Sequence, residues 1–153
     1  MKKIKVFLFL IVLLCSFVTP AQKEYFEKYQ GVADSLEKRY GIPSSIMLAI
    51  AFHESGAGKS RNAKLLHNHF GITGSNDLKR THNITSRYKQ FSSVVESYAA
   101  FCQLVAKRAY YAELKGTTDV KKWVTTIAKS GYAGSSVSWA EKIKWIISHY
   151  KLN

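Results

Sequence analysis

Residues 46–52 form an unbroken apolar stretch, Ile-Met-Leu-Ala-Ile-Ala-Phe. A helix that is apolar on every side does not lie on a surface, because it can be stable only inside a domain. Pro43 suits the first turn of such a helix, and Gly56 follows just beyond its end. The stretch therefore predicts a central helix around which the rest of the chain packs.

Glu54 closes this helix, just before the glycine-rich bend Ser55-Gly56-Ala57-Gly58. Apolar surroundings and the negative end of the helix dipole both disfavour a carboxylate, and no Lys or Arg stands within the preceding turn. Together these effects predict a raised pKa for Glu54, and a protonated carboxyl group can act as a general acid. The pattern alone also fits a Glu that ends a core helix with its head in water.

The first 21 residues have the features of a secretion signal peptide. Lysines at positions 2, 3 and 5 precede an apolar run at residues 6–14, and Thr19-Pro20-Ala21 supplies small residues before a cleavage point. The run is too short for a transmembrane helix. We therefore expect a signal at residues 1–21 and one domain at residues 22–153. The mature protein would reach the periplasm, cell envelope or exterior, without stable membrane insertion.

The chain is strongly basic, and without the three leader lysines its net charge falls only from +13 to +10. Such a surface attracts polyanions, which include nucleic acid, anionic lipid and the phosphates and carboxylates of a bacterial wall. The signal peptide favours the wall, and no stacking motif supports a nucleic-acid partner. The alternative is that the lysines serve solubility alone.

Cysteine and histidine usage predicts neither disulfides nor a metal site. Only Cys102 remains after the leader is removed, and its apolar helical surroundings predict a buried structural role. His67 and His69 have no Cys, Asp or Glu near them in a zinc-binding spacing. We expect no metal and no cofactor.

Apolar spacings of three and four predict helices along most of the chain. Residues 73–87 are polar and predict a loop or small hairpin. The expected fold is mainly α (α+β), with about six helices and a short loop or β-hairpin beside a cleft. The expected helices are 23–40, the central helix ending at Glu54, 60–66 capped by Ser60, 93–108 opened by a capping box of Ser93 and Glu96, one starting at Thr118-Asp119, and a last one opened by a box of Ser138 and Glu141.

Three blocks of residues, in order along the chain, resemble the signature of bacterial glucosaminidase domains, glycoside hydrolase family 73. The first covers residues 53–60 and 63–65 and continues into Asn68-His69-Phe70-Gly71-Ile72. The second covers residues 88–97, and the third joins Gly131-Tyr132-Ala133 to residues 139–143. The blocks cover most of the chain after the leader.

This resemblance implies a lysozyme-like fold and hydrolysis of the β-1,4 bond after N-acetylglucosamine in peptidoglycan. It places Glu54 on the general acid of the family and Tyr132 on a cleft tyrosine that positions substrate. Asn68, His69 and Phe70 fall on the segment that builds the cleft floor, with His69 replacing the usual second Asn. Phe70 is also a candidate for the core.

The second carboxylate is where the chain departs from the family. Glycoside hydrolysis usually needs two carboxylates, and family members often supply the second as a Glu in a hairpin. Between Ile72 and Tyr88 the only acid is Asp77, which serves either as the second catalytic group or as a solvated turn residue.

Three interpretations of the site follow. Glu54 works with water activated by Asp77 or by the substrate N-acetyl group, or it acts alone like the single Glu of lytic transglycosylases. In the third interpretation, the chain is a non-hydrolytic peptidoglycan-binding or assembly module with a degenerate site.

Overall fold

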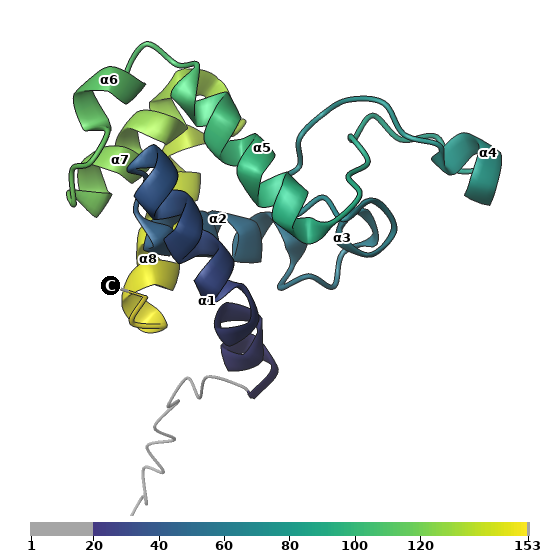
Figure 1. Cartoon of the computed structure of the whole chain (residues 1–153), viewed down its shortest axis with the longest axis horizontal. Coiled ribbons are helices and arrows are strands. Elements are labelled where there is room, and N and C mark those ends of the chain that lie inside the picture. The colour runs from purple at the N-terminus through teal and green to yellow at the C-terminus, as the bar shows by residue number, and fades with distance from the viewer. Residues whose placement is uncertain (1–19, 153) are drawn as a thin grey trace, which may run out of the picture.

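The apolar stretch lies in helix α2 (Ser44–Ser55), which runs through the middle of the molecule (Figure 1). In this computed structural model, which describes residues 20–152, every side chain from position 46 to position 51 is fully buried. Helix α2 packs against α1 (Pro20–Tyr40), α7 (Val120–Ile127) and α8 (Ser136–His149). The predicted central helix is confirmed.

The fold is mainly helical, as predicted, with more and shorter helices than the six expected. The other elements are α3 (Arg61–Leu66), α4 (Leu78–His82), α5 (Val94–Ala106), α6 (Tyr111–Leu114) and the short π-helix η1 (Ala128–Tyr132). Residues 20–152 contain no sheet, and their one isolated β-bridge joins Thr73 to Tyr88. The predicted signal peptide lies outside the described residues except for Pro20 and Ala21, which begin α1.

Residues 73–90 form an arm that projects from the helical body, with α4 at its tip (Figure 1). Its two extended sides meet at the Thr73–Tyr88 bridge, and the amide of Asn76 donates to the carbonyls of Ser86 and Tyr88 at 2.9 and 2.7 Å. Leu78 is the only fully buried side chain in the arm. Hydrogen bonds rather than an apolar core therefore shape this predicted loop or hairpin.

The predicted capping box of Ser138 and Glu141 is wrong. Helix α8 begins at Ser136 with Ser135 as its N-cap, so Ser138 lies inside the first turn and donates to Ser135 Oγ at 2.8 Å. Glu141 pairs with Lys144 instead of the helix start. At three other helix starts the predicted cap accepts a backbone N–H, at Ser60, Ser93 and Asp119.

Cys102 is completely buried, which confirms its predicted burial. Its thiol lies 3.3 Å from Met47 Sδ on α2, and burial raises the pKa of the thiol to about 12. No helix within residues 20–152 is both long and apolar enough to cross a membrane. The same residues bring no three His, Cys, Asp or Glu side chains together as a metal site.

Candidate active site

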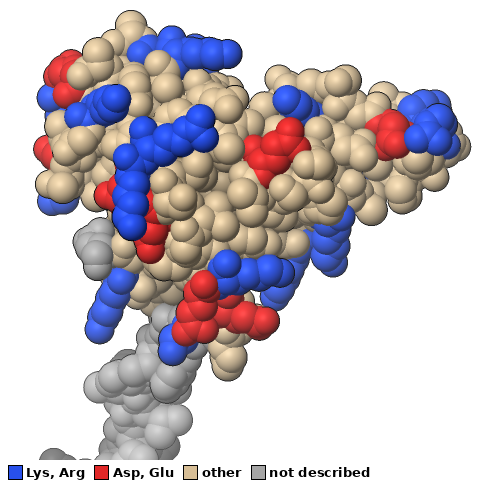
Figure 2. All heavy atoms as spheres, viewed as in Figure 1, with Lys and Arg blue, Asp and Glu red and all other residues tan. Residues whose placement is uncertain are grey.

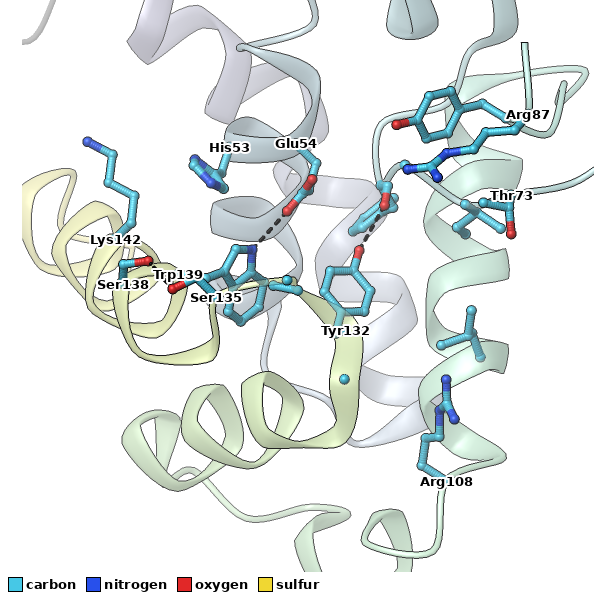
Figure 3. A pocket seen from close by; sticks show the side chains of 18 residues that line it. His53, Glu54, Thr73, Arg87, Arg108, Tyr132, Ser135, Ser138, Trp139 and Lys142 are labelled. Carbon is cyan, nitrogen blue, oxygen red and sulfur yellow. Dashed lines mark hydrogen bonds between the residues drawn. The ribbon is translucent and has the colours of Figure 1, made fainter.

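Glu54 lies in the last turn of α2, where the left-handed conformation of Gly56 ends the helix. Its side chain is half-buried and borders a cleft of about 930 Å³ between α2, α5, α8 and the base of the arm (Figure 3). Among the described residues that line this cleft, Glu54 is the only carboxylate. Any carboxyl chemistry in the cleft therefore falls to Glu54.

One oxygen of Glu54 is held by Trp139 of α8, which follows 85 positions later in the sequence. The Trp139 indole Nε1 donates a hydrogen bond of 2.8 Å to Glu54 Oε1 (Figure 3). The Trp139 side chain is almost fully buried, and a buried indole N–H, which can only donate, needs an acceptor. The bond thus satisfies Trp139 and fixes the orientation of the carboxyl group.

The other oxygen, Oε2, faces a space that Gly71 keeps open. A Cβ atom at position 71 would lie 3.8 Å from Glu54 Oε2 and 3.9 Å from Tyr88 Cε1. Gly71 has φ +66°, a left-handed conformation that side chains disfavour. A substrate oxygen can approach Oε2 through this space.

Tyr132 lies in the cleft, where the family resemblance places it. Its hydroxyl donates to the Phe70 carbonyl at 2.9 Å, and its ring lies 5.4 Å from the Trp139 ring. Burial, reinforced by the charge of Glu54, raises the pKa of Tyr132 well above the ordinary tyrosine value. Tyr132 is therefore a neutral phenol that lines the cleft.

Asn68 lies beneath the cleft and does not line it. Its side-chain amide donates to the carbonyls of Ile72 and Lys89, both at 2.8 Å, and its carbonyl oxygen accepts the N–H groups of Ile72 and Phe70. Asn68 is 1% exposed. It fixes the loop next to Glu54 to the base of the arm, so its geometry suits a positioning role.

His69 is also buried and does not line the cleft. Its Nδ1 lies 2.8 Å from the Tyr25 hydroxyl, and the two rings stack. Burial first, and then the nearby His67 and Lys28, lower the pKa of His69 to about 4. His69 is therefore a neutral core residue at pH 7. Phe70 borders the cleft but packs mainly into the core, where it stacks on Phe101 at 4.5 Å.

Asp77 is not brought to Glu54. It lies just before α4 at the tip of the arm, borders a separate surface hollow and pairs with Arg80 at 2.7 Å. Its backbone N–H donates to the Gln90 side chain. The two carboxylates that the sequence offers as a pair thus lie in different parts of the molecule.

Basic side chains line the cleft on two sides, at positions that the sequence alone did not indicate. Lys142 lies on one side of the cleft, while Arg87 from the arm and Arg108 beyond α5 lie on the other (Figure 3). None of the three forms an ion pair with any residue that the structure describes. The net charge alone predicted many cations but not their positions. In the sequence, Trp139 stood out only as part of the third motif block, although its indole N–H needs an acceptor when buried.

The helical body, with a cleft beside its central helix, is a lysozyme-like domain. The chain belongs to the glucosaminidase family, described as mannosyl-glycoprotein endo-β-N-acetylglucosaminidase, whose model matches residues 22–152. Family membership confirms the resemblance drawn from the three sequence blocks. The family is one of glycoside hydrolases.

Several characterised proteins are similar to this chain. Exo-glucosaminidase LytG of Bacillus subtilis is 25% identical, and the match covers 86% of this chain but only 52% of LytG, so this chain spans about half the length of that relative. The catalytic domain of the autolysin Auto from Listeria monocytogenes is 22% identical with a TM-score of 0.73, over 89% of this chain and 88% of that one. A glycoside hydrolase domain of FlgJ from Salmonella typhimurium is 20% identical with a TM-score of 0.68, over 85% and 97% of the two chains. These structures establish the lysozyme-like fold.

Proposed function

We propose that this protein is an exported peptidoglycan hydrolase that cleaves the β-1,4 bond after N-acetylglucosamine, with Glu54 as the general acid. The observation that carries the proposal is how the two carboxyl oxygens of Glu54 are placed in a chain of the glucosaminidase family. One of its oxygens is bound by Trp139, and the other faces the open space beside Gly71. Export rests on the predicted signal peptide.

In the proposed reaction, Glu54 gives its proton to the glycosidic oxygen as the bond from that oxygen to C1 breaks. Because no second carboxylate lines the described cleft, the N-acetyl carbonyl oxygen of the same sugar forms the new bond to C1. Water then adds to C1, the bond to the acetyl oxygen breaks, and Glu54 takes the proton of the water. Glu54 is thereby restored to its acid form.

The remaining lining suits an aminosugar strand. Tyr132 and Trp139 supply aromatic surface on which the apolar face of a sugar ring can pack, and Trp139 keeps Glu54 from rotating away. The unpaired cations at the rim attract an anionic wall polymer. Asp77, ion-paired to Arg80 in the arm, has no step in this scheme.

The test is the chemical identity of the new chain end. Purified peptidoglycan is digested with the full chain, the products are reduced with borohydride, and the reduced sugar is identified by mass spectrometry. The proposal predicts reduced N-acetylglucosamine. Reduced N-acetylmuramic acid would indicate cleavage of the other bond, and products lighter by one water would indicate a lytic transglycosylase. Binding without any product, which the lack of a second carboxylate would explain, would indicate a non-hydrolytic module.

A further inference from the structure

A second hollow, of about 450 Å³, continues the cleft away from Glu54. It shares Ile72, Thr73, Leu104 and Arg108 with the cleft and adds Lys89 from the arm and Lys107 from the end of α5. We call it the basic hollow, because Lys89, Lys107 and Arg108 are its charged lining. A strand that fills the cleft would have its substituents next to this hollow.

The lining of the basic hollow includes three cations and no acid. Outside the lining, Glu96 interacts electrostatically with Lys89. None of Lys89, Lys107 and Arg108 forms an ion pair within residues 20–152. Other cations of the described chain do so at 2.6 to 2.7 Å, among them Arg80, Lys122 and Lys144. Like charges gathered in one hollow repel each other, and a bound anion would relieve that repulsion.

Helix capping does not account for the cluster. Lys107 and Arg108 follow the last turn of α5, where cations interact favourably with the helix dipole. Lys89 belongs to the arm, at no helix end, and yet it faces the same hollow. Its presence there points to a ligand shared by the two segments.

The backbone at Lys89 is held in place rather than free. Its N–H donates to the Ile72 carbonyl, and its carbonyl accepts from Asn68, both at 2.8 Å. Its side chain lies against Gly74, where a Cβ atom would approach Lys89 Cβ to 2.9 Å, and its ammonium lies 5.0 Å from the centre of the Phe91 ring. Asn68, which fixes the loop beside Glu54, therefore also fixes the position of Lys89.

We propose that the basic hollow binds a free carboxylate of the peptide stem attached to the glycan strand in the cleft. This inference rests on the proposed function. Stem carboxylates are tethered to the sugar chain, so a strand bound in the cleft presents them at a high effective concentration. Lysine and arginine donors both bind carboxylates with charge-assisted hydrogen bonds.

The test uses Glu54→Gln protein, which should bind wall without degrading it, in pelleting assays with peptidoglycan stripped of phosphate polymers. Adding Lys89→Gln and Lys107→Gln should raise the apparent Kd roughly tenfold, since each exposed charge pair contributes a few-fold. On peptidoglycan whose carboxylates have been amidated with carbodiimide, the parent and the double variant should bind equally. The matched control, Lys38→Gln with Lys121→Gln, removes two exposed cations that line neither hollow nor cleft and should bind like the parent.

Equal binding of the parent and the double variant to unmodified peptidoglycan would overturn the inference. The inference would also be overturned if the double variant bound amidated peptidoglycan more weakly than the parent by the same factor as on unmodified peptidoglycan. The lysines would then act on the sugar or on the fold. A loss seen only before the phosphate polymers are removed would make phosphate the ligand. Because this assay measures binding without turnover, it can fail while the product analysis succeeds, and the reverse also holds.

Discussion

The helical body and the arm each carry one of the two acids that the sequence offers for catalysis, and they hold them differently. Glu54 belongs to α2, whose side chains at positions 46–51 are wholly buried, and an indole fixes one of its oxygens. Asp77 lies in a segment with one buried side chain and pairs with Arg80, a neighbour three residues away. For this reason the proposed reaction assigns the catalytic carboxyl group to the body.

The arm contributes at its base instead of its tip. Arg87 and Tyr88 line the cleft and Lys89 lines the basic hollow, whereas α4 lies at the far end (Figure 1). Cations also outnumber acids on the face seen in Figure 2. We therefore expect the arm to act in substrate binding. Five predictions test this comparison, ordered from the largest expected effect to the smallest.

Replacing Glu54 with Gln should lower the rate of reducing-end release by about 1000-fold or more. The change keeps the shape and the acceptor for Trp139 but removes the transferable proton, and general acid catalysis contributes about 100- to 10,000-fold. Circular dichroism serves as the folding control. Comparable turnover by Glu54→Gln and the unmodified protein would remove Glu54 from the chemistry.

Replacing Asn68 with Leu should lower the free energy of unfolding by about 4 kcal/mol, since several buried backbone groups would lose their partner. Asn76→Leu is the matched change in the arm. This change should lower the free energy of unfolding by only about 1 kcal/mol, because the backbone carbonyls that lose their partner lie nearer to water. Urea unfolding measures both, and equal losses would contradict the contrast between body and arm.

Stability should depend on pH through His69. Its pKa is about 4 in the folded protein against 6.5 when unfolded, so the unfolded state binds the extra proton. The contribution of neutral His69 is fully present above pH 6.5. It is lost as the pH falls to about 4, by about 3 kcal/mol in total. His69→Asn should flatten this part of the profile, and an unchanged slope would show that His69 does not control it. The carboxylates of Glu96 and Glu113, with pKa values lowered below 4.5, act at lower pH.

Replacing Trp139 with Phe should lower kcat about tenfold with little change in KM. An aromatic ring stays in the core, but Glu54 loses the donor that orients it and that stabilises the carboxylate formed as the proton leaves. A hydrogen bond to a charged group contributes about 1.5 kcal/mol or more. Trp145→Phe is the control on the same helix, with a half-exposed ring outside the cleft. If both variants lost the same activity, the indole bond would not be the cause.

Replacing Asp77 with Asn should change the rate less than twofold. The exposed ion pair with Arg80 contributes little, and Asp77 faces a separate hollow. Steady-state kinetics on peptidoglycan provide the measurement. A loss near that of Glu54→Gln would mean that the arm folds over the cleft and supplies the second carboxylate.

The body was largely predictable from the sequence because its signals are local. The apolar run defined α2, and Ser60, Ser93 and Asp119 marked helix starts. The arm has little apolar periodicity to read, so its helix α4 was missed. Two serines lie near the start of α8, and the N-cap is Ser135 rather than Ser138.

The candidate site was only partly predictable, because its main contacts join distant segments. Glu54 and Tyr132 could be placed from motif blocks. The bond between Trp139 and Glu54 spans 85 positions, and no local spacing encodes it. The basic hollow is likewise lined by residues that are distant in the sequence, from the arm and from the end of α5. The number of cations follows from the composition, whereas their positions follow only from the fold.

The central claim is that Glu54 works with the N-acetyl group of the substrate and without a second carboxylate. The most direct measurement is the configuration at C1 of the newly released end, followed by proton NMR before the anomers equilibrate. Two displacements at C1, first by the acetyl oxygen and then by water, predict the β-anomer as the first product. An initial α-anomer would mean a single displacement by water activated by a separate base, and would contradict the account.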